Sequence, residues 1–201
     1  MSKNLLPGIK QFDLSGRSAV ITGGSKGLGL AMAAALASAG ARIMLVNRNT
    51  EEGIGAARER TADYGVKALS FGADITDSVQ TEAMAKVAME AFSEVDILIN
   101  SAGINIRGPI DEVTADDFNK VMDVNVNGTW LCCRAMVPHM KKRRSGKIIN
   151  LASTLGLVGV PVTRHVLLHR VGLQSHEPRP RHPHAQQDHP ARVAHRDRRR
   201  R

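Results

Sequence analysis

Cysteine and aromatic residues are scarce in this chain of 201 residues, which has two Cys, one Trp, one Tyr and four Phe. The two cysteines, Cys132 and Cys133, are adjacent, and on a helix their side chains diverge by about 100°, so they cannot form a structural bridge. A disulfide scaffold is therefore excluded. We expect reduced thiols in an intracellular compartment.

Long apolar runs are also absent from the sequence. The first 16 residues, MSKNLLPGIKQFDLSG, lack the apolar stretch of a signal peptide, and no segment reaches membrane length. We therefore expect a cytoplasmic protein without a membrane partner. A length of 201 residues fits one domain with a sizeable core.

Carboxylates are few at one end of the chain. Residues 162–201 hold 10 Arg and 7 His against three carboxylates, so this segment supplies most of the net charge of +9. Lys, Ile, Asn, Phe, Tyr, Met, Trp and Cys are all missing from it, whereas residues 1–161 are close to neutral. The change of composition predicts a domain over 12–161 and a basic, disordered tail over 162–201.

Between Arg17 and Leu151, short β-branched runs alternate with longer helical stretches. Strands separated by helices of this length form parallel βαβ units with right-handed crossovers. The sequence therefore predicts an α/β fold, a doubly wound parallel sheet of Rossmann type with about five strands. The apolar runs VDILIN and KIINLA predict strands buried on both faces. The expected strands are 18–24, 41–47, 66–74, 95–100 and 146–153, and the expected helices are 26–40, 50–65, 78–94 and 115–142.

A glycine-rich segment, TGGSKGLG (22–29), lies where the first expected strand meets the first expected helix. Glycines there permit a tight turn and let the backbone approach a pyrophosphate, which sits at the helix N-terminus because free N–H groups favour anions. An ordinary turn between a strand and a helix is the alternative. The surrounding βαβ repeat favours a dinucleotide site.

Residues 12–161 resemble the short-chain dehydrogenase/reductase family. Five motifs in family order carry the resemblance: TGGSKGLG (22–29), GADITD (72–77), NSAG (100–103), VNVNG (124–128) and IINLAST (148–154). The resemblance implies an NAD(P)-dependent oxidoreductase that acts on the carbonyl or secondary alcohol of a small substrate, in a family whose members are usually homo-oligomers. The expected cofactor-binding residues are Thr22, Gly23, Ser25, Lys26, Gly27, Leu28, Gly29, Asn47, Arg48, Asp74, Ile75, Asn100, Ala102 and Gly103.

Two longer stretches narrow this resemblance. FDLSGRSAVITGGSKGLG and SAGINIRGP are similar to gluconate 5-dehydrogenase-like and 3-oxoacyl-carrier-protein reductase-like members. The substrate classes that they imply are a sugar acid or a 3-oxoacyl thioester, and the sequence does not separate the two.

The end of the second expected strand bears on the choice of cofactor. A dinucleotide site usually has an acid there, about 20 residues past the glycines, which binds the ribose 2′-OH and repels a 2′-phosphate. Asn47 occupies this place and Arg48 follows, while Lys26 adds a second positive group. NADP(H) is therefore favoured over NAD(H), because a guanidinium can clamp the phosphate. The alternative is that both cations are solvated surface charges.

Two of the four catalytic groups that the family resemblance implies are present. Ser153 matches the serine that orients the carbonyl, and Asn125 matches the asparagine that holds a proton-relaying water. The tyrosine acid/base is expected at Val166 and its lysine at Arg170, and both are missing; Tyr64, the only tyrosine, has no lysine four residues later. We expect an inactive or nearly inactive chain, because loss of acid catalysis slows such reactions about 10²–10⁴-fold.

The rest of the family fold cannot be traced past residue 161, so we expect a sheet with one uncovered edge and face. A frameshift near codon 162 of a GC-rich gene best explains the tail, because off-frame reading gives mainly Arg, Pro, His, Ala and Gly. A nucleic-acid-binding arm comes second, since no aromatic residues interleave for base stacking. A histidine-rich metal site comes third: His165 and His169 have helical spacing, but the segment has no cysteine and no regular ligand frame.

The coding DNA tests the frameshift. We expect another reading frame after codon 161 to restore a recognisable family continuation with Tyr-x-x-x-Lys, and sequencing the gene checks this. A one-nucleotide shift can yield Tyr from the codons of Val166 and Leu167, although it cannot yield Lys at 170. If no frame restores a continuation, the frameshift explanation fails.

Overall fold

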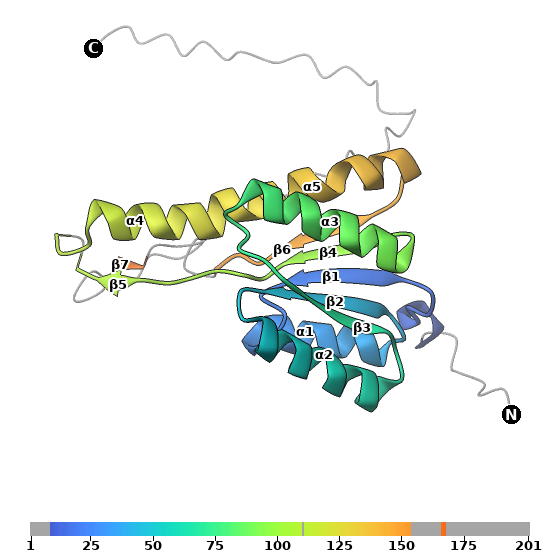
Figure 1. The fold of residues 1–201 in the computed structure, drawn as a ribbon. Helices are drawn as coiled ribbons and strands as arrows, with labels where there is room; N and C mark the ends of the chain where they lie inside the picture. Colours follow the sequence, from blue (N-terminus) through green and yellow to red (C-terminus); the bar gives the residue numbers. More distant parts are fainter. Residues whose placement is uncertain (1–8, 110, 154–165, 168–201) are drawn as a thin grey trace, which may run out of the picture.

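The structure, a computed structural model, describes residues 9–109, 111–153 and 166–167. Its centre is a five-stranded parallel sheet with strand order β3-β2-β1-β4-β6 (Figure 1). The strands are β1 (Ser18–Thr22), β2 (Arg42–Asn47), β3 (Ala68–Gly72), β4 (Ile97–Asn100) and β6 (Lys147–Asn150). The predicted doubly wound α/β sheet of Rossmann type is confirmed.

The helices between the strands begin and end close to the expected residues. Asn49 and Asp77 cap the N-termini of α2 and α3 with their side chains, and Gly65 closes α2 in a left-handed conformation. None of the described helices is both long and apolar enough to cross a bilayer. The helices are η1 (Ile9–Phe12), α1 (Gly27–Ser38), α2 (Thr50–Tyr64), α3 (Ser78–Phe92), α4 (Ala115–Met122), η2 (Asp123–Asn127) and α5 (Gly128–Arg143).

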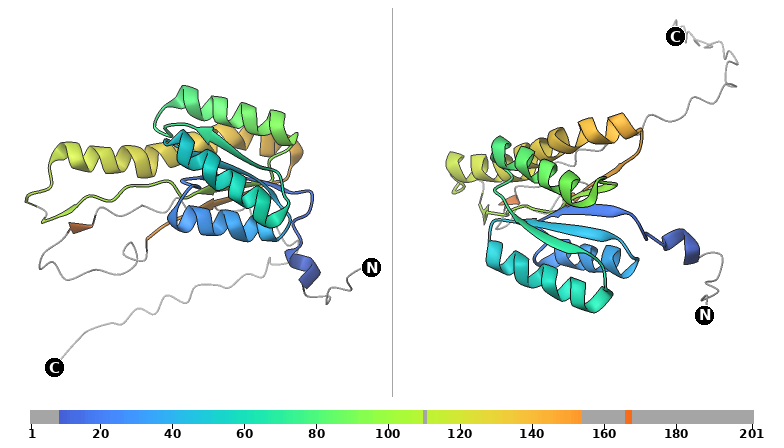
Figure 2. Two further views of the ribbon diagram at one scale, coloured as in Figure 1. Left: turned by 60° about the horizontal axis from the view of Figure 1, so that its bottom comes forward. Right: turned by 45° about the vertical axis from the view of Figure 1, so that its right-hand side comes forward.

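Helices cover the sheet from two sides and form two cores. Helices α1 and α2 lie on one face, and α3 and α5 lie on the other (Figure 2). Along β1, Val20 packs toward α3 and α5, whereas Ile21 packs toward α1 and α2, because successive side chains of a strand point to opposite faces. The strands are therefore apolar on both sides where helices cover both faces.

Strand β6 departs from the expected burial on both faces. Ile148 packs against the core under α3 and α5, but Ile149 is 47% exposed. Helices α1 and α2 lie over β1, β2 and β3, and no helix of the described residues covers β6 on that side (Figure 1). Within the described part of the chain, the sheet thus has an open edge and an open face at β6.

The prediction of a single helix over 115–142 is wrong in one respect. The segment is helical throughout, but a π-helical turn, η2, separates α4 from α5. A π turn inserts one additional residue into the helical repeat, and such turns are frequent at functional sites. Asn125, one of the two expected catalytic residues, lies within this turn.

A two-residue antiparallel pair was not expected from the sequence. Strand β5 (Arg107–Gly108) pairs with β7 (Val166–Leu167), so that Gly108 lies opposite Val166. Val166 is the position at which the family resemblance places tyrosine. The remainder of 162–201 lies outside the described residues, and its disorder and the boundary at 161 stay predictions.

Asp96 connects three elements at the amino ends of the strands. The Ser18 N–H donates to its Oδ2 at 3.0 Å, and Arg17 and Arg143 donate to its Oδ1 at 3.0 and 3.1 Å. Burial by itself would raise the pKa of this carboxyl, but the bonds from Ser18, Arg143 and Arg17 outweigh it and hold the pKa below its ordinary value. The carboxylate therefore joins β1, β4 and the end of α5.

Asp96→Ala should lower the free energy of unfolding by about 2 kcal/mol at neutral pH, because it removes the acceptor of the buried Ser18 N–H and one of the two carboxylate partners of Arg143. The pKa of Asp96 is lower in the folded than in the unfolded chain, where it is about 3.9. Its stabilisation is thus fully present above that unfolded value and is lost as the pH falls through the folded one. Urea unfolding across the acid range checks this.

The control for this experiment is Asp63→Ala. Asp63 pairs with Arg60 at 3.2 Å, but its side chain is 53% exposed. Exposed pairs contribute about 0–1 kcal/mol. Equal destabilisation by the two substitutions, or the same acid dependence in the Asp96 variant and the parent, would contradict the role of Asp96.

Candidate functional site

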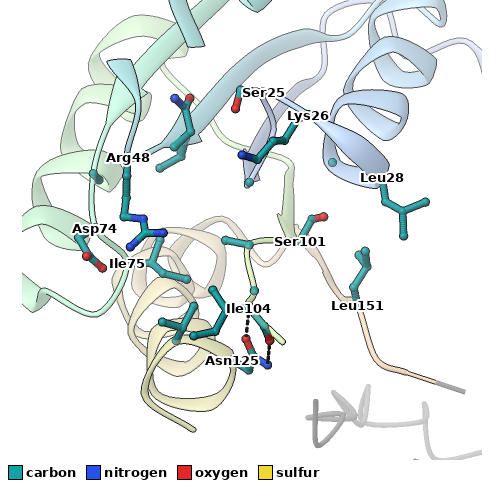
Figure 3. Close-up of a pocket in the computed structure, with 18 of the residues that line it drawn as sticks. Ser25, Lys26, Leu28, Arg48, Asp74, Ile75, Ser101, Ile104, Asn125 and Leu151 are labelled. Carbon is teal, nitrogen blue, oxygen red and sulfur yellow. Dashed lines mark hydrogen bonds between the residues drawn. The ribbon is translucent and has the colours of Figure 1, made fainter. Parts of the chain in front are cut away.

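A cavity of about 650 Å³ opens at the carboxyl ends of the central strands (Figure 3). Strand β1 pairs with β2 on one side and β4 on the other, and the chain continues from β1 to the helices on one face of the sheet and from β4 to those on the other. Such a topological switch point is where open α/β sheets bind ligands. Of the expected site residues, those that line it are Gly23, Ser25, Lys26, Leu28, Gly29, Asn47, Arg48, Asp74, Ile75, Ala102, Gly103, Asn125 and Ser153.

The glycine-rich loop packs directly against the loop after β4. Gly23 has a φ of 65°, and a Cβ added there would lie 2.8 Å from the backbone of Ala102. A Cβ on Gly29 would overlap the carbonyl of Gly23. These two glycines are therefore needed for close backbone contact.

Thr22 lies beneath the cavity and does not line it. Its side chain is fully buried, and its hydroxyl oxygen accepts the N–H of Ser101 at 3.1 Å and that of Ala102 at 3.2 Å. The threonine thus fixes the loop after β4 onto the end of β1. Gly27 and Asn100, two further expected cofactor residues, also do not line the cavity.

Asn100 belongs to a polar cluster behind the cavity. Its Nδ2 donates to Oδ1 of Asn150 at 2.8 Å and contacts Sγ of Cys133 at 3.3 Å. Burial raises the pKa of the neighbouring Cys132 thiol to about 12, and it also raises the pKa of Cys133. Both thiols are therefore protonated at neutral pH, which disfavours a nucleophilic role for either.

The loop after β2 brings Asn47 and Arg48 to the cavity, but in different ways. The Asn47 amide donates to the carbonyl of Asn49, and a Cβ on Gly53 would overlap this amide, so its polar end packs against the first turn of α2. Arg48 is exposed and lies beside Asp74 and Ile75, across the cavity from the loop that carries Lys26 (Figure 3). Neither Lys26 nor Arg48 forms an ion pair with any described residue.

Glu52 is a cavity residue that sequence reasoning missed. It lies in the first turn of α2, where the side chain of Asn49 accepts its N–H at 3.1 Å. Its Oε1 accepts the hydroxyl of Ser25 at 3.1 Å, and Ser25 is 8% exposed. The only sequence signal was its place one turn into the helix that follows β2. Other lining residues that were not expected are Val46, Asn49, Ala73, Ser101, Ile104, Asn105, Val124, Leu151 and Ala152.

Asp74 and Ile75 form the wall after β3. Oδ1 of Asp74 accepts the N–H and the hydroxyl of Thr76 at 3.0 and 2.8 Å, and the Asp74 N–H donates to Gln80 at 2.9 Å. A Cβ on Gly128 would approach the Ile75 side chain to 2.7 Å. Both wall residues are thus held in place from outside the cavity.

Asn125 holds the far end of the cavity. Its Oδ1 accepts the N–H of Ile104, and its Nδ2 donates to the carbonyl of the same residue, both at 2.9 Å (Figure 3). The hydroxyl of Thr129 donates to the Asn125 carbonyl at 2.9 Å. The asparagine side chain therefore clamps the loop after β4.

Ser153 lines the cavity together with Asn125, so the structure brings the two expected catalytic residues to one site. The two missing groups cannot be placed in the same way: Val166 is described only as part of β7, and Arg170 lies outside the described residues. No group of three His, Cys, Asp or Glu side chains within the described ranges could hold a metal ion. The histidines of 162–201 lie outside those ranges.

Residues 17–165 match the family model of short chain dehydrogenases. The chain belongs to this family. Among solved structures, a crystal structure from Sinorhizobium meliloti 1021 that is titled as a short-chain alcohol dehydrogenase superimposes with a TM-score of 0.71. The two sequences are 32% identical, and the match covers 75% of this chain and 60% of that one.

Curated short-chain dehydrogenases are similar to the chain at a comparable level. D-threitol dehydrogenase of Mycolicibacterium smegmatis is 34% identical over 74% of this chain and 57% of its own length. The 2-(R)-hydroxypropyl-CoM dehydrogenase of Xanthobacter autotrophicus is 37% identical over 72% and 59%, and the 3beta-hydroxysteroid dehydrogenase 1 of Eggerthella lenta is 35% identical over 74% and 58%. The chain thus spans less than two thirds of the length of these relatives.

Thr22→Val tests the contact beneath the cavity. Valine keeps the shape of threonine but leaves two backbone N–H groups without their acceptor, so we expect the free energy of unfolding to fall by about 2 kcal/mol. Thr22→Ser keeps the hydroxyl and should be milder by about 1 kcal/mol. Urea unfolding measures both variants. A valine variant as stable as the serine variant would contradict the role of the hydroxyl.

Proposed function

We propose that the chain is an NAD(P)-dependent oxidoreductase domain that binds NADP(H) in the cavity, and that it catalyses poorly or not at all as written. The observation that carries the proposal is the continuity of the cavity. The same cavity extends from the glycine-rich loop past Arg48 and Asp74 to Asn125 and Ser153. A dinucleotide with an adenine end and a reactive end needs such an extended site.

The N-terminus of α1 supports a pyrophosphate site at the glycine-rich loop. Side chains cap α2, α3 and α4, but the N-cap residue of α1, Lys26, makes no side-chain cap, and the first turn of α1 has no acid. Its N–H groups therefore suit an anion better than those of the other three helices. The adenine would then lie against Asp74 and Ile75, and the nicotinamide toward Ser153.

The charges around the expected ribose position favour NADP(H). Asn47 carries no charge, and its amide is bound to the carbonyl of Asn49, so the usual repulsion of a 2′-phosphate is missing at the end of β2. Lys26 and Arg48 line the cavity and can bind the phosphate.

The reaction class follows from the groups that face the far end of the cavity. When bound, the nicotinamide supplies or accepts a hydride. The Ser153 hydroxyl would orient the carbonyl or secondary alcohol of a small substrate, while Asn125 fixes the loop beside it. Proton transfer lacks a donor, because valine and arginine stand at the expected tyrosine and lysine positions, 166 and 170.

The substrate is proposed only by class. The similar proteins are named for D-threitol, 2-(R)-hydroxypropyl-CoM and a 3beta-hydroxysteroid, all of which are alcohols. A sugar acid or a 3-oxoacyl thioester is consistent with the motifs at 12–29 and 101–109. We further propose a cytoplasmic location and the homo-oligomeric state usual in the family. A non-enzymatic nucleotide-binding role, or a basic arm on nucleic acid, is the alternative.

Arg48→Ala should weaken NADPH binding about tenfold and change NADH binding less than twofold, because it removes a charge-assisted contact to the 2′-phosphate alone. Titration calorimetry with the full chain measures both affinities. Arg58→Ala is the matched control, since Arg58 is exposed on α2 and does not line the cavity. Equal losses for the two cofactors would contradict the assignment of Arg48.

Activity measurements complete the test. NADPH oxidation with a panel of carbonyl substrates should stay near background, and ready turnover would refute the proposed inactivity. Lack of binding of either cofactor would refute the proposed function. Salt-sensitive DNA binding that disappears when 162–201 is removed would favour the basic arm instead.

A further inference from the structure

Besides Asp74 on the wall after β3, three charged side chains line the cavity, from the glycine-rich loop and from the segment that leads from β2 into α2. Lys26 and Arg48 are cationic and exposed, whereas Glu52 is anionic and half-buried. The proposed function uses the two cations to bind a 2′-phosphate. It leaves unexplained why a carboxylate should line the same region.

The contact of Glu52 is with the glycine-rich loop itself. The Ser25 hydroxyl donates to its Oε1 at 3.1 Å across a separation of 27 residues. Ser25 is buried and stands beside Lys26, so a phosphate bound at Lys26 competes with Glu52 for the same hydroxyl. The backbone of Glu52 is also fixed, because its N–H donates to the side chain of the N-cap residue Asn49.

The residue at the end of β2 cannot supply the negative charge. Asn47 is neutral, and its amide packs against the first turn of α2 beside Gly53. Glu52 therefore contributes, from the helix, the carboxylate that a dinucleotide site more often carries at the strand end. A carboxylate there can accept a ribose 2′-OH and repels a 2′-phosphate.

We propose that Glu52 is a specificity-determining residue that opposes Lys26 and Arg48 and limits the preference of the site for 2′-phosphorylated nucleotides. The proposal rests on the proposed function, because it assumes that the adenosine ribose lies in this part of the cavity. A bound 2′-phosphate displaces Glu52 from Ser25 and lies near its charge. A bound 2′-OH requires neither change.

Two nucleotides that differ only by the 2′-phosphate probe this directly. Adenosine 5′-monophosphate and adenosine 2′,5′-bisphosphate are titrated into the full chain at low salt by calorimetry. Glu52→Gln removes the charge but keeps an oxygen that can accept the Ser25 hydroxyl, so the loop contact is retained. We expect the variant to bind the bisphosphate about fivefold more tightly and the monophosphate within twofold of the parent.

Glu51→Gln is the matched control. Glu51 precedes Glu52 in the first turn of α2 and has the same charge, but it is exposed and does not line the cavity. It should change the affinity for either probe by less than twofold, because the high dielectric constant of water weakens the field of an exposed charge.

The possible results separate the two proposals. If the parent binds both probes and Glu52→Gln leaves the ratio of their affinities unchanged, the role of Glu52 is refuted while the nucleotide site stands. The same holds if Glu51→Gln shifts the ratio equally, since the effect would then be one of net charge. If the parent binds neither probe, the proposed function fails and the role of Glu52 fails with it.

Discussion

The contact between the loop after β1 and the loop after β4 determines the shape of the whole site. Gly23 lets the first loop approach the backbone of Ala102, and the Thr22 hydroxyl binds two successive N–H groups of the second loop. Asn125 then holds Ile104, farther along this second loop, through both of its side-chain polar atoms. Because one backbone segment joins these contacts, the glycine-rich end and the Asn125 end of the cavity are fixed relative to each other.

Hydrophobic periodicity was enough to predict the strands, the helices and the sheet class, because each reflects burial repeated over many residues. Features set by single residues or by distant neighbours were not predictable in this way. The π turn around Asn125 adds one residue to an otherwise unbroken helical pattern. The apolar run KIINLA predicts a strand buried on both faces, yet Ile149 of β6 is exposed because burial depends on what covers a face. The pair of β5 with β7 is too short to have a period.

The candidate site was predictable where its residues follow directly from strand ends. Carboxyl ends of parallel strands meet at one edge of a sheet, so the motifs at 22–29, 74–75, 100–103 and 151–153 had to converge, and most of their expected residues line one cavity. Glu52 had no such signal, since its contact with Ser25 depends on how α2 packs beside the glycine-rich loop. The asparagine at the end of β2 was visible in the sequence, but nothing there indicated that the Asn47 amide packs against α2.

The arrangement separates the groups proposed for binding from those proposed for chemistry. The residues proposed to hold the nucleotide follow β1, β2 and β3, and most of the contacts that fix them lie within 22–105, with Gly128 packed against Ile75 in addition. The proposed reaction depends on Ser153 after β6 and on two positions beyond it, where valine and arginine stand. The contacts named above at the glycine-rich end of the cavity involve neither of those two positions. Under the proposed function, a nucleotide site can therefore persist in a chain that lacks the proposed proton donor.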